Sequence, residues 1–316
     1  MSTSVLTITL NPCIDKSSTV KGIVPEKKLR CEAPKYEPGG GGINVSRALK
    51  RLGTTSGTLF TSGGRTGKLL EELLQKEELD IIPLPVGNET RENFIVVDTL
   101  NNQQFRFGFP GRPISDEEQV NIKKAIESIA SFPEITVISG SLPEEVEPEF
   151  IKDIIRICKR KNSKVIVDTS GKSLELAVDE GVFLAKPNIG ELAILSGESE
   201  LTDATMDEAA KKLIQNGKAE IIVVSLGAKG AVLYAEKEKI RQAAPIVKVR
   251  STVGAGDSMV AGMVSVLVNK GDMEEMLRMG IACGSATTMA EGTGLFRKED
   301  VDNLYQQLQR GRKRDT

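Results

Sequence analysis

The hydrophobic and polar positions of the chain follow two spacings. Residues 5–10 alternate and are rich in β-branched side chains, which is typical of a strand. Apolar residues at positions 45, 48, 49 and 52 instead share one face of a helix. Together the two spacings predict strands at 5–10, 56–61, 135–138, 164–168, 182–185, 220–225 and 231–234, and helices at 43–52, 65–78, 115–131, 147–161, 189–195, 205–216, 257–270, 272–290 and 297–309.

This alternation of strands and helices predicts an α/β fold with a mostly parallel sheet covered by helices on both faces. Two segments do not fit the rhythm. Residues 11–38 hold short extended pieces, and residues 90–110 read as a β-hairpin with strands at 93–98 and 104–108. We interpret both as a small β-sheet lid inserted in a single domain spanning 1–316.

Composition restricts the partners of the protein. The net charge of -2 creates no field that would attract nucleic acid or an anionic membrane. No signal peptide precedes the first strand, and no apolar run is long enough to span a bilayer. The four cysteines lie far apart, which fits reduced thiols in the cytoplasm.

The chain contains no histidine. This absence excludes Ser-His-Asp and Cys-His hydrolases and every metal site that depends on imidazole. A general base must therefore be Asp, Glu, Lys, Tyr or Cys.

Polar and glycine-rich segments recur where predicted strands end. They are residues 39–44, 139–141, 168–171, 186–188, 225–230 and 252–257. Because ligands of open α/β sheets bind outside the carboxyl ends of the strands, these segments predict one site along a single sheet edge.

The familiar nucleotide motifs are absent. A dinucleotide-binding fingerprint would need a third glycine at position 44 or 45, which hold Asn44 and Val45. Residues 64–69 imitate a P-loop, but Ser62 replaces its leading glycine and Leu69 its metal-binding hydroxyl. Neither a Rossmann dehydrogenase nor a Walker-type NTPase is indicated.

Residues 252–257 combine two glycines with an aspartate between a β-like run at 246–249 and an apolar helix. A helix start of this kind binds anions, because its free N–H groups and the positive end of its dipole point the same way. Asp257 is either the N-cap of that helix or a catalytic base beside a phosphate cradle. The sequence leaves both interpretations open.

Four other polar residues are also ambiguous. Asn188 and Glu191 form a capping-box variant, or Glu191 orders Mg²⁺ or its waters on a nucleotide phosphate. Lys28 and Arg91 are lid cations that are either solvated or bound to an anionic substrate.

Taken in order, these segments resemble the ribokinase-like PfkB carbohydrate kinases, and within that family the minor type of bacterial 6-phosphofructokinase. The resemblance runs from about residue 5 to 305. It rests on residues 9–12 with Asp15, 28–30, 37–45, 138–143, 186–188 with Glu191, 224–227 and 252–257.

The resemblance implies a Rossmann-like α/β/α domain whose lid clasps a second subunit in a homodimer. It implies ATP-dependent phosphorylation of fructose 6-phosphate at the 1-hydroxyl. The alternatives are a 1-phosphofructokinase or a tagatose-6-phosphate kinase, and a non-catalytic protein that only binds a sugar phosphate. Such sensors tend to lose the base or the metal-organising carboxylate, and this chain keeps Asp257 and Glu191.

The resemblance also assigns roles. Asp257 matches the catalytic base, with Gly254, Ala255 and Gly256 as the anion hole. The substrate positions are Asp15, Lys28, Gly39, Gly40, Asn44, Arg91 and Ser141. The ATP positions are Lys186, Asn188, Ser225, Gly227, Gly230 and Thr252, with Glu191 for Mg²⁺ and with Ser251 and Val253 beside a monovalent cation such as K⁺.

Two departures from the family pattern affect these expectations. Many members have Asp and Thr where this chain has Ser251 and Val253, which weakens the case for the cation site. Relatives acting on fructose 1-phosphate or tagatose 6-phosphate commonly have lysine in the glycine run, where this chain has glycine. The second departure favours 6-phosphofructokinase activity.

Overall fold

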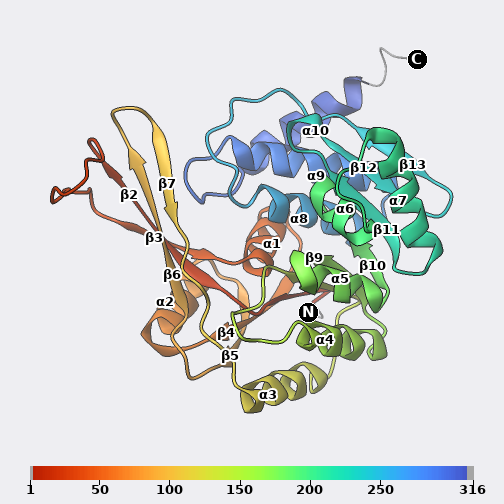
Figure 1. Cartoon of the computed structure of the whole chain (residues 1–316), viewed down its shortest axis with the longest axis horizontal. Helices are drawn as coiled ribbons and strands as arrows, with labels where there is room; N and C mark the ends of the chain where they lie inside the picture. Colours follow the sequence, from red (N-terminus) through yellow and green to blue (C-terminus); the bar gives the residue numbers. More distant parts are fainter. Residues whose placement is uncertain (1–2, 312–316) are drawn as a thin grey trace.

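The computed structural model describes residues 3–311, which form two sheets and the helices that cover them (Figure 1). The large sheet has nine strands in the order β13-β12-β11-β10-β9-β8-β1-β4-β5, and all its pairs are parallel except β11–β12 and β12–β13, because β12 runs antiparallel to both neighbours. Its strands are β1 (Val5–Thr9), β4 (Ser56–Ser62), β5 (Asp80–Pro85), β8 (Ile135–Ser139), β9 (Lys164–Asp168), β10 (Val182–Ala185), β11 (Ala219–Ser225), β12 (Ala231–Tyr234) and β13 (Lys239–Gln242).

Helices cover both faces of this sheet, as the alternating pattern predicts. One apolar core lies under α3, α4, α5, α6 and α7, and a second lies under α1, α8, α9 and α10. The helices are α1 (Gly41–Arg51), α2 (Gly64–Lys76), α3 (Asp116–Glu127), α4 (Glu149–Arg160), α5 (Gly171–Asp179), α6 (Ile189–Ser196), α7 (Asp203–Gln215), α8 (Ala255–Val268), α9 (Met273–Thr288) and α10 (Lys298–Gly311). The central strands are buried on both sides because each of their faces packs against one of these layers.

The smaller sheet projects from one side of the molecule and contains four strands in the order β3-β2-β6-β7 (Figure 1). Its strands are β2 (Cys13–Val20), β3 (Lys35–Gly39), β6 (Arg91–Asp98) and β7 (Gln103–Phe107). The β6–β7 pair is the hairpin that the sequence predicts. The α/β class with an added lid sheet is therefore confirmed.

Some elements differ from the sequence prediction for identifiable reasons. Residues 246–249 are not a strand, because Ile246 is fully exposed and has no strand to pair with. The sequence prediction missed strand β5 because the segment contains prolines, which disfavour strands. Prolines are tolerated here because β5 lies at the edge of the sheet. The sequence prediction also missed helix α5. This helix begins at Gly171, which has a positive φ of 58°, and it follows polar residues that are typical of a loop.

The topology places one crevice in the large sheet. Strand β1 lies between β8 and β4. The chain first builds the sheet on one side of β1, with β4 and β5, and later continues on its other side with β8, so the direction of strand addition reverses at β1. Such a reversal opens a crevice at the carboxyl ends of the strands, where α/β proteins bind ligands. Among residues 3–311, no helix is long and apolar enough to cross a membrane.

Candidate active site

Asp257 lies above the crevice, in the first turn of α8. The helix is capped by Gly254 in the left-handed conformation, with φ 72°, and no side chain bonds its first amides. The Asp257 carboxylate points away from the helix and accepts hydrogen bonds from Asn44 Nδ2 at 2.9 Å and Ser139 Oγ at 3.4 Å. Its interpretation as an N-cap is therefore wrong.

Close backbone packing brings the two donors to Asp257. Helix α1 starts at Gly41, where a Cβ atom would collide with Ser139 Oγ and the Gly140 amide at the end of β8. Gly40 precedes it with a φ of 119°, which glycine adopts without strain. The glycine run thus lets the start of α1 reach the end of β8, and Asn44 then faces Asp257.

Buried charges surround the carboxylate. Burial, and after it the negative charge of Asp168, raise the pKa of Asp257, which is about 6. The hydrogen bond from Asn44, the charge of Lys186 and the hydrogen bond from Ser139 oppose this rise. An aspartate with a pKa near 6 remains ionised at neutral pH and is a stronger base than an ordinary carboxylate.

Lys186 and Asp168 form a buried ion pair beside the helix start, with 3.1 Å between Nζ and Oδ1. Burial lowers the pKa of Lys186, but Asp168, Asp257 and Glu191 outweigh it and the net shift is upward. Lys186 is therefore a fixed cation. Gly256 packs close to it, because a Cβ on that residue would lie 3.5 Å from Nζ.

Asp15 lies on β2 at the base of the lid and is 7% exposed. Its Oδ1 accepts hydrogen bonds from Asn93 Nδ2 at 2.9 Å and from the Cys13 thiol at 3.5 Å. Gly39 packs so tightly here that a Cβ atom would overlap both Asp15 and Cys13. The carboxylate is thus held in one orientation beside the glycine run.

Of the residues predicted to bind the substrate phosphate, Arg91 and Ser141 lie close together and Lys28 lies apart. Arg91 begins β6 and is bound to Asn11, Asn93 and the Phe109 carbonyl. Ser141 lies in the loop after β8 and accepts a hydrogen bond from Asn11. Lys28 is exposed in the loop between β2 and β3, and among residues 3–311 no hydrogen bond or ion pair joins it to the other predicted residues.

The predicted ATP residues follow the next strands of the same edge. Asn188 and Ser225 join β10 and β11 through an isolated bridge. Gly227 and Gly230, with φ of 58° and 94°, form the turn after β11. Thr252 is exposed before α8, whereas Ser251 is buried and its Oγ accepts the Val253 amide at 3.3 Å.

Glu191 completes a capping box with Asn188, because each side chain accepts the other's backbone amide. Among the described residues, no three acidic or cysteine side chains come close enough to hold a metal ion. The chain therefore offers Glu191 as a single carboxylate at this helix start rather than a cage of protein ligands.

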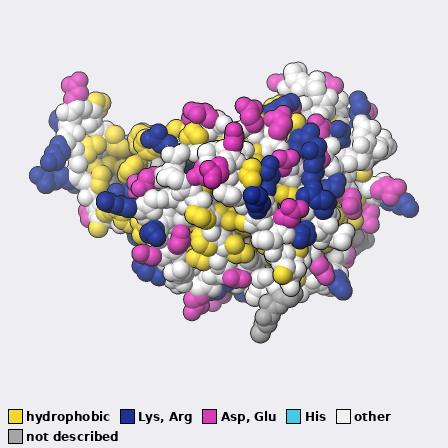
Figure 2. All heavy atoms as spheres, turned by 90° about the horizontal axis from the view of Figure 1, so that it is seen from below, with side chains coloured by type: hydrophobic (Ala, Val, Ile, Leu, Met, Phe, Trp, Pro, Cys, Tyr) yellow, Lys and Arg dark blue, Asp and Glu magenta, His cyan; other side chains and the backbone are white. Residues whose placement is uncertain are grey.

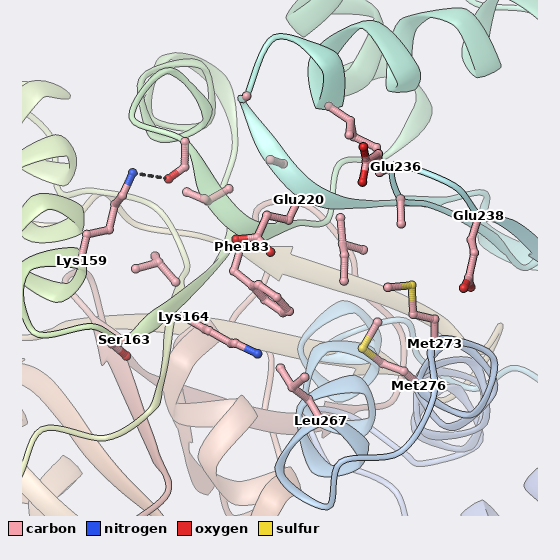
Figure 3. A pocket seen from close by; sticks show the side chains of 18 of the residues that line it. Lys159, Ser163, Lys164, Phe183, Glu220, Glu236, Glu238, Leu267, Met273 and Met276 are labelled. Carbon is pink, nitrogen blue, oxygen red and sulfur yellow. Dashed lines mark hydrogen bonds between the residues drawn. The ribbon is translucent and has the colours of Figure 1, made fainter.

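A surface hollow of about 1530 Å³ lies at the opposite edge of the sheet, where the strands begin. Its wall includes Lys164 and Val182, which begin β9 and β10, and Lys164 Nζ lies 4.7 Å from the Phe183 ring centre (Figure 3). None of the predicted site residues lines it.

Sequence reasoning overlooked three contributors. Asp168 was visible only as one residue of a polar segment, and its pairing with Lys186 depends on the adjacency of β9 and β10. Asn93 carries no local signal, and Asn11 was visible only as one residue of the segment 9–12, with no role assigned to it. Their amides bond side chains that are 78 and 130 positions away.

The geometry agrees with comparisons to known proteins. A model of the "pfkB family carbohydrate kinase" matches residues 4–300. The chain is 39% identical to the ATP-dependent 6-phosphofructokinase isozyme 2 of Escherichia coli K12, covering 97% of this chain and 99% of that one. It is 34% identical to the 1-phosphofructokinase of Bacillus subtilis, covering 92% and 94%, and 30% identical to a tagatose-6-phosphate kinase of Staphylococcus epidermidis, covering 96% and 98%.

Solved structures give the same picture. The fold matches phosphofructokinase-2 from Escherichia coli in complex with potassium, with a TM-score of 0.93 and 38% identity. It matches the complex of that enzyme with fructose-6-phosphate at a TM-score of 0.91 and 37% identity. Each comparison covers 97% of this chain and 99% of the other.

Proposed function

The chain belongs to the pfkB family of carbohydrate kinases, and on that premise we propose that it transfers the γ-phosphoryl group of ATP to the 1-hydroxyl of fructose 6-phosphate. The product would be fructose 1,6-bisphosphate. The observation that carries the proposal is Asp257, a carboxylate with a raised pKa held between Asn44 and Ser139 at a helix start. The choice of sugar rests on the higher identity to 6-phosphofructokinase than to the two other sugar-phosphate kinases.

In this mechanism Asp257 accepts the proton of the attacking hydroxyl. Phosphoryl transfer needs little covalent assistance, so positioning and charge stabilisation account for most of the acceleration. Among the described residues the Gly254 and Gly256 amides have no hydrogen-bond partner, and the Ala255 amide makes only a long bond of 3.4 Å to the Thr252 carbonyl. These amides would therefore face the developing negative charge. Lys186 adds a fixed positive charge beside them.

The sugar would bind between Asp15, Gly39, Gly40 and Asn44, with its phosphate toward Arg91 and Ser141. Asp15 is an acceptor for sugar hydroxyls because its carboxylate is oriented by neighbours that leave Oδ2 free of hydrogen bonds among the described residues. Lys28 would reach the phosphate only through lid movement or from a second subunit, since it lies exposed on the lid loop.

ATP would lie along the ends of β10 and β11, over Lys186, Asn188, Ser225, Gly227, Gly230 and Thr252. Mg²⁺ would neutralise charge on its phosphates, and Glu191 would hold the water shell of that ion. A monovalent cation such as K⁺ would lie near Ser251 and Val253. The potassium complex of the Escherichia coli relative supports its presence, and the lack of a carboxylate at Ser251 argues for weak binding.

We also propose a homodimer formed through the lid. Tyr36, Lys16, Phe94 and Phe107 are paired across the four lid strands and form one row, called here the lid row. Its three aromatic rings are 36–51% exposed, and Figure 2 shows hydrophobic side chains gathered on this projecting part. Exposed apolar sheet surfaces of this kind are usually covered by a partner. The same proposal places the enzyme in the cytoplasm, where its free cysteines stay reduced.

An ATP-coupled assay over fructose 6-phosphate, fructose 1-phosphate, tagatose 6-phosphate, ribose and adenosine tests the proposed reaction. We expect the highest kcat/KM with fructose 6-phosphate. Preference for fructose 1-phosphate or tagatose 6-phosphate would replace the substrate but keep the mechanism. If none of the compounds is phosphorylated, the chain is a binding protein built on a kinase scaffold.

A further inference from the structure

Arg91 is immobilised without being neutralised. Its Nε donates to Asn11 Oδ1 at 2.9 Å and its Nη2 to the Asn11 carbonyl at 3.3 Å. Its Nη1 donates to Asn93 Oδ1 at 3.0 Å and to the Phe109 carbonyl at 3.2 Å. All four acceptors are uncharged, and among the described residues Arg91 has no ion pair. A guanidinium fixed in this way keeps its full charge for an anionic ligand.

Asn11 connects this cation to the other side of the crevice. It follows β1, and its Nδ2 donates to Ser141 Oγ at 3.1 Å and to the Leu142 carbonyl at 3.2 Å. Its Oδ1 meanwhile accepts from Arg91. One amide group therefore links the first residue of β6 to the loop after β8.

The Asn11 side chain also has little freedom to move. Gly111 packs directly on its amide, so that a Cβ atom at position 111 would overlap Oδ1 and Cγ. With both amide hydrogens and the carbonyl oxygen engaged, any rotation of this side chain would break contacts on both sides. Arg91 and Ser141 are thus oriented by the same residue.

This inference rests on the proposed function and deepens it. We propose that Asn11 is a positioning residue that joins Arg91 and Ser141 into one cradle for the phosphate group that the sugar already carries. It touches neither Asp257 nor the residues assigned to ATP. Its loss should weaken recognition of the phosphorylated sugar and leave the transfer step intact, because the acceptor hydroxyl lies at the far end of the substrate.

The Asn11→Ala variant tests this role with the sugar phosphate that the wild type turns over best. We expect its KM for that substrate to rise about 10- to 100-fold, the loss expected when a charged hydrogen bond is disordered. The kcat and the KM for ATP should stay near the wild-type values. Asn88→Ala is the matched control, since Asn88 Nδ2 donates to the Pro113 carbonyl nearby without touching Arg91.

Two further variants exclude a merely structural effect. Asn11→Asp keeps the acceptor for Arg91 but adds a negative charge, so it should raise KM for the sugar phosphate more than Asn11→Ala does. Gly111→Ala leaves Asn11 in place but displaces its amide, and it should reproduce the rise in KM. An unchanged KM in Asn11→Ala and Asn11→Asp, or an equal loss in kcat and in affinity for ATP, would overturn the proposal.

Binding of inorganic phosphate, measured by calorimetry without sugar or ATP, separates this inference from the proposed function. Wild-type protein should bind phosphate more tightly than Asn11→Ala even if no sugar of the assay is phosphorylated. Equal phosphate affinity of the two proteins would refute the cradle, whatever the substrate proves to be.

Discussion

At the scale of single residues, Asp257 shows how a fold makes an ordinary side chain reactive. It lies at a helix start, where an aspartate usually caps, but its oxygens are turned toward Asn44 and Ser139. Burial and the nearby charge of Asp168 then raise its pKa to about 6. The side chain therefore does not cap the helix, and its raised pKa suits the general base that we propose it to be.

Replacing Asp257 with asparagine should lower kcat about 10²- to 10⁴-fold, the usual effect of losing a general base. Stability should not fall with it. Because the pKa is raised on folding, the ionised carboxylate costs stability above pH 6 and this cost disappears below the unfolded value of 3.8. Asp257→Asn should therefore melt at the same or a higher temperature at pH 8.

Asp272 provides the matched control at the start of the neighbouring helix α9. Its side chain does cap, accepting the Glu275 amide at 2.8 Å. Asp272→Ala should lose about 1 kcal/mol of stability and keep its turnover. If Asp257→Asn instead lost stability and kept near-normal turnover, the catalytic role of Asp257 would have to be abandoned.

The pH profile of kcat/KM offers a second test at this scale. Activity should fall tenfold per unit below about pH 6, as Asp257 becomes protonated. Asp168→Asn should move this limb to lower pH, since it removes a repelling charge and frees Lys186 to act on Asp257. Ser139→Ala should move it to higher pH, since it removes a donor that favours the charged form. Shifts in the same direction would show that these two residues do not set the pKa.

At the scale of elements, the first turn of helix α6 has two proposed roles, which are helix capping and Mg²⁺ binding. Asn188 and Glu191 close a capping box, so the structural interpretation of this motif is confirmed. The capping bond uses Glu191 Oε2 and leaves the carboxylate its charge, so the same residue can also hold the water shell of Mg²⁺. Capping and metal binding therefore do not compete.

Two substitutions separate these duties. Gln also closes a capping box, so Glu191→Gln should melt within a few degrees of the wild type while needing more Mg²⁺ for half-maximal activity at fixed ATP. Asn188→Ala should instead lose about 1 kcal/mol of stability. A Glu191→Gln enzyme with an unchanged Mg²⁺ requirement would leave capping as the only function of Glu191.

Glycines decide how closely elements approach one another. The start of α1 reaches the end of β8 only because Gly41 has no Cβ, and this contact brings Asn44 toward Asp257. The sequence shows a glycine run before a helix, which is enough to predict a loop with an unusual backbone. It does not reveal which strand end that loop will touch.

At the scale of the whole molecule, the lid is the part through which we propose that the protein dimerises. The lid row lies on the exposed face of a sheet whose outer strands β3 and β7 each leave one edge unpaired among the described residues. Lys16 Nζ lies 5.1 Å and 5.4 Å from the ring centres of Tyr36 and Phe94, which keeps these rings on one face. Burial of this row in a dimer would also bring Lys28 of each lid close to a second chain. That one domain spans 1–316 with an inserted lid stays a prediction.

We expect the wild type to sediment as a dimer at micromolar concentration and Phe107→Glu as a monomer, because the new carboxylate would be buried without a partner. Val120→Glu, an equally exposed position on α3, should remain dimeric. A wild-type monomer, or equal dissociation of both variants, would place the interface elsewhere or remove it.

The sequence by itself determined the order and type of most elements, the α/β class and the edge of the sheet that carries the site. These follow from hydrophobic spacing and from glycine and polar residues at strand ends, which are local properties. Its resemblance to a kinase family added the identities of the site residues. The sequence also showed that an aspartate, Asp257, lies at the start of a predicted helix.

Only the tertiary structure decided the surroundings of that aspartate, on which its proposed role depends. Its hydrogen-bond donors are 213 and 118 positions away in the chain, and Asp168 and Lys186 reach it from two adjacent strands. A pKa depends on burial and on charges within a few ångströms, and neither quantity has a local signature. The same reason hides Asn11, whose role exists only because β1, β6 and β8 meet at one crevice.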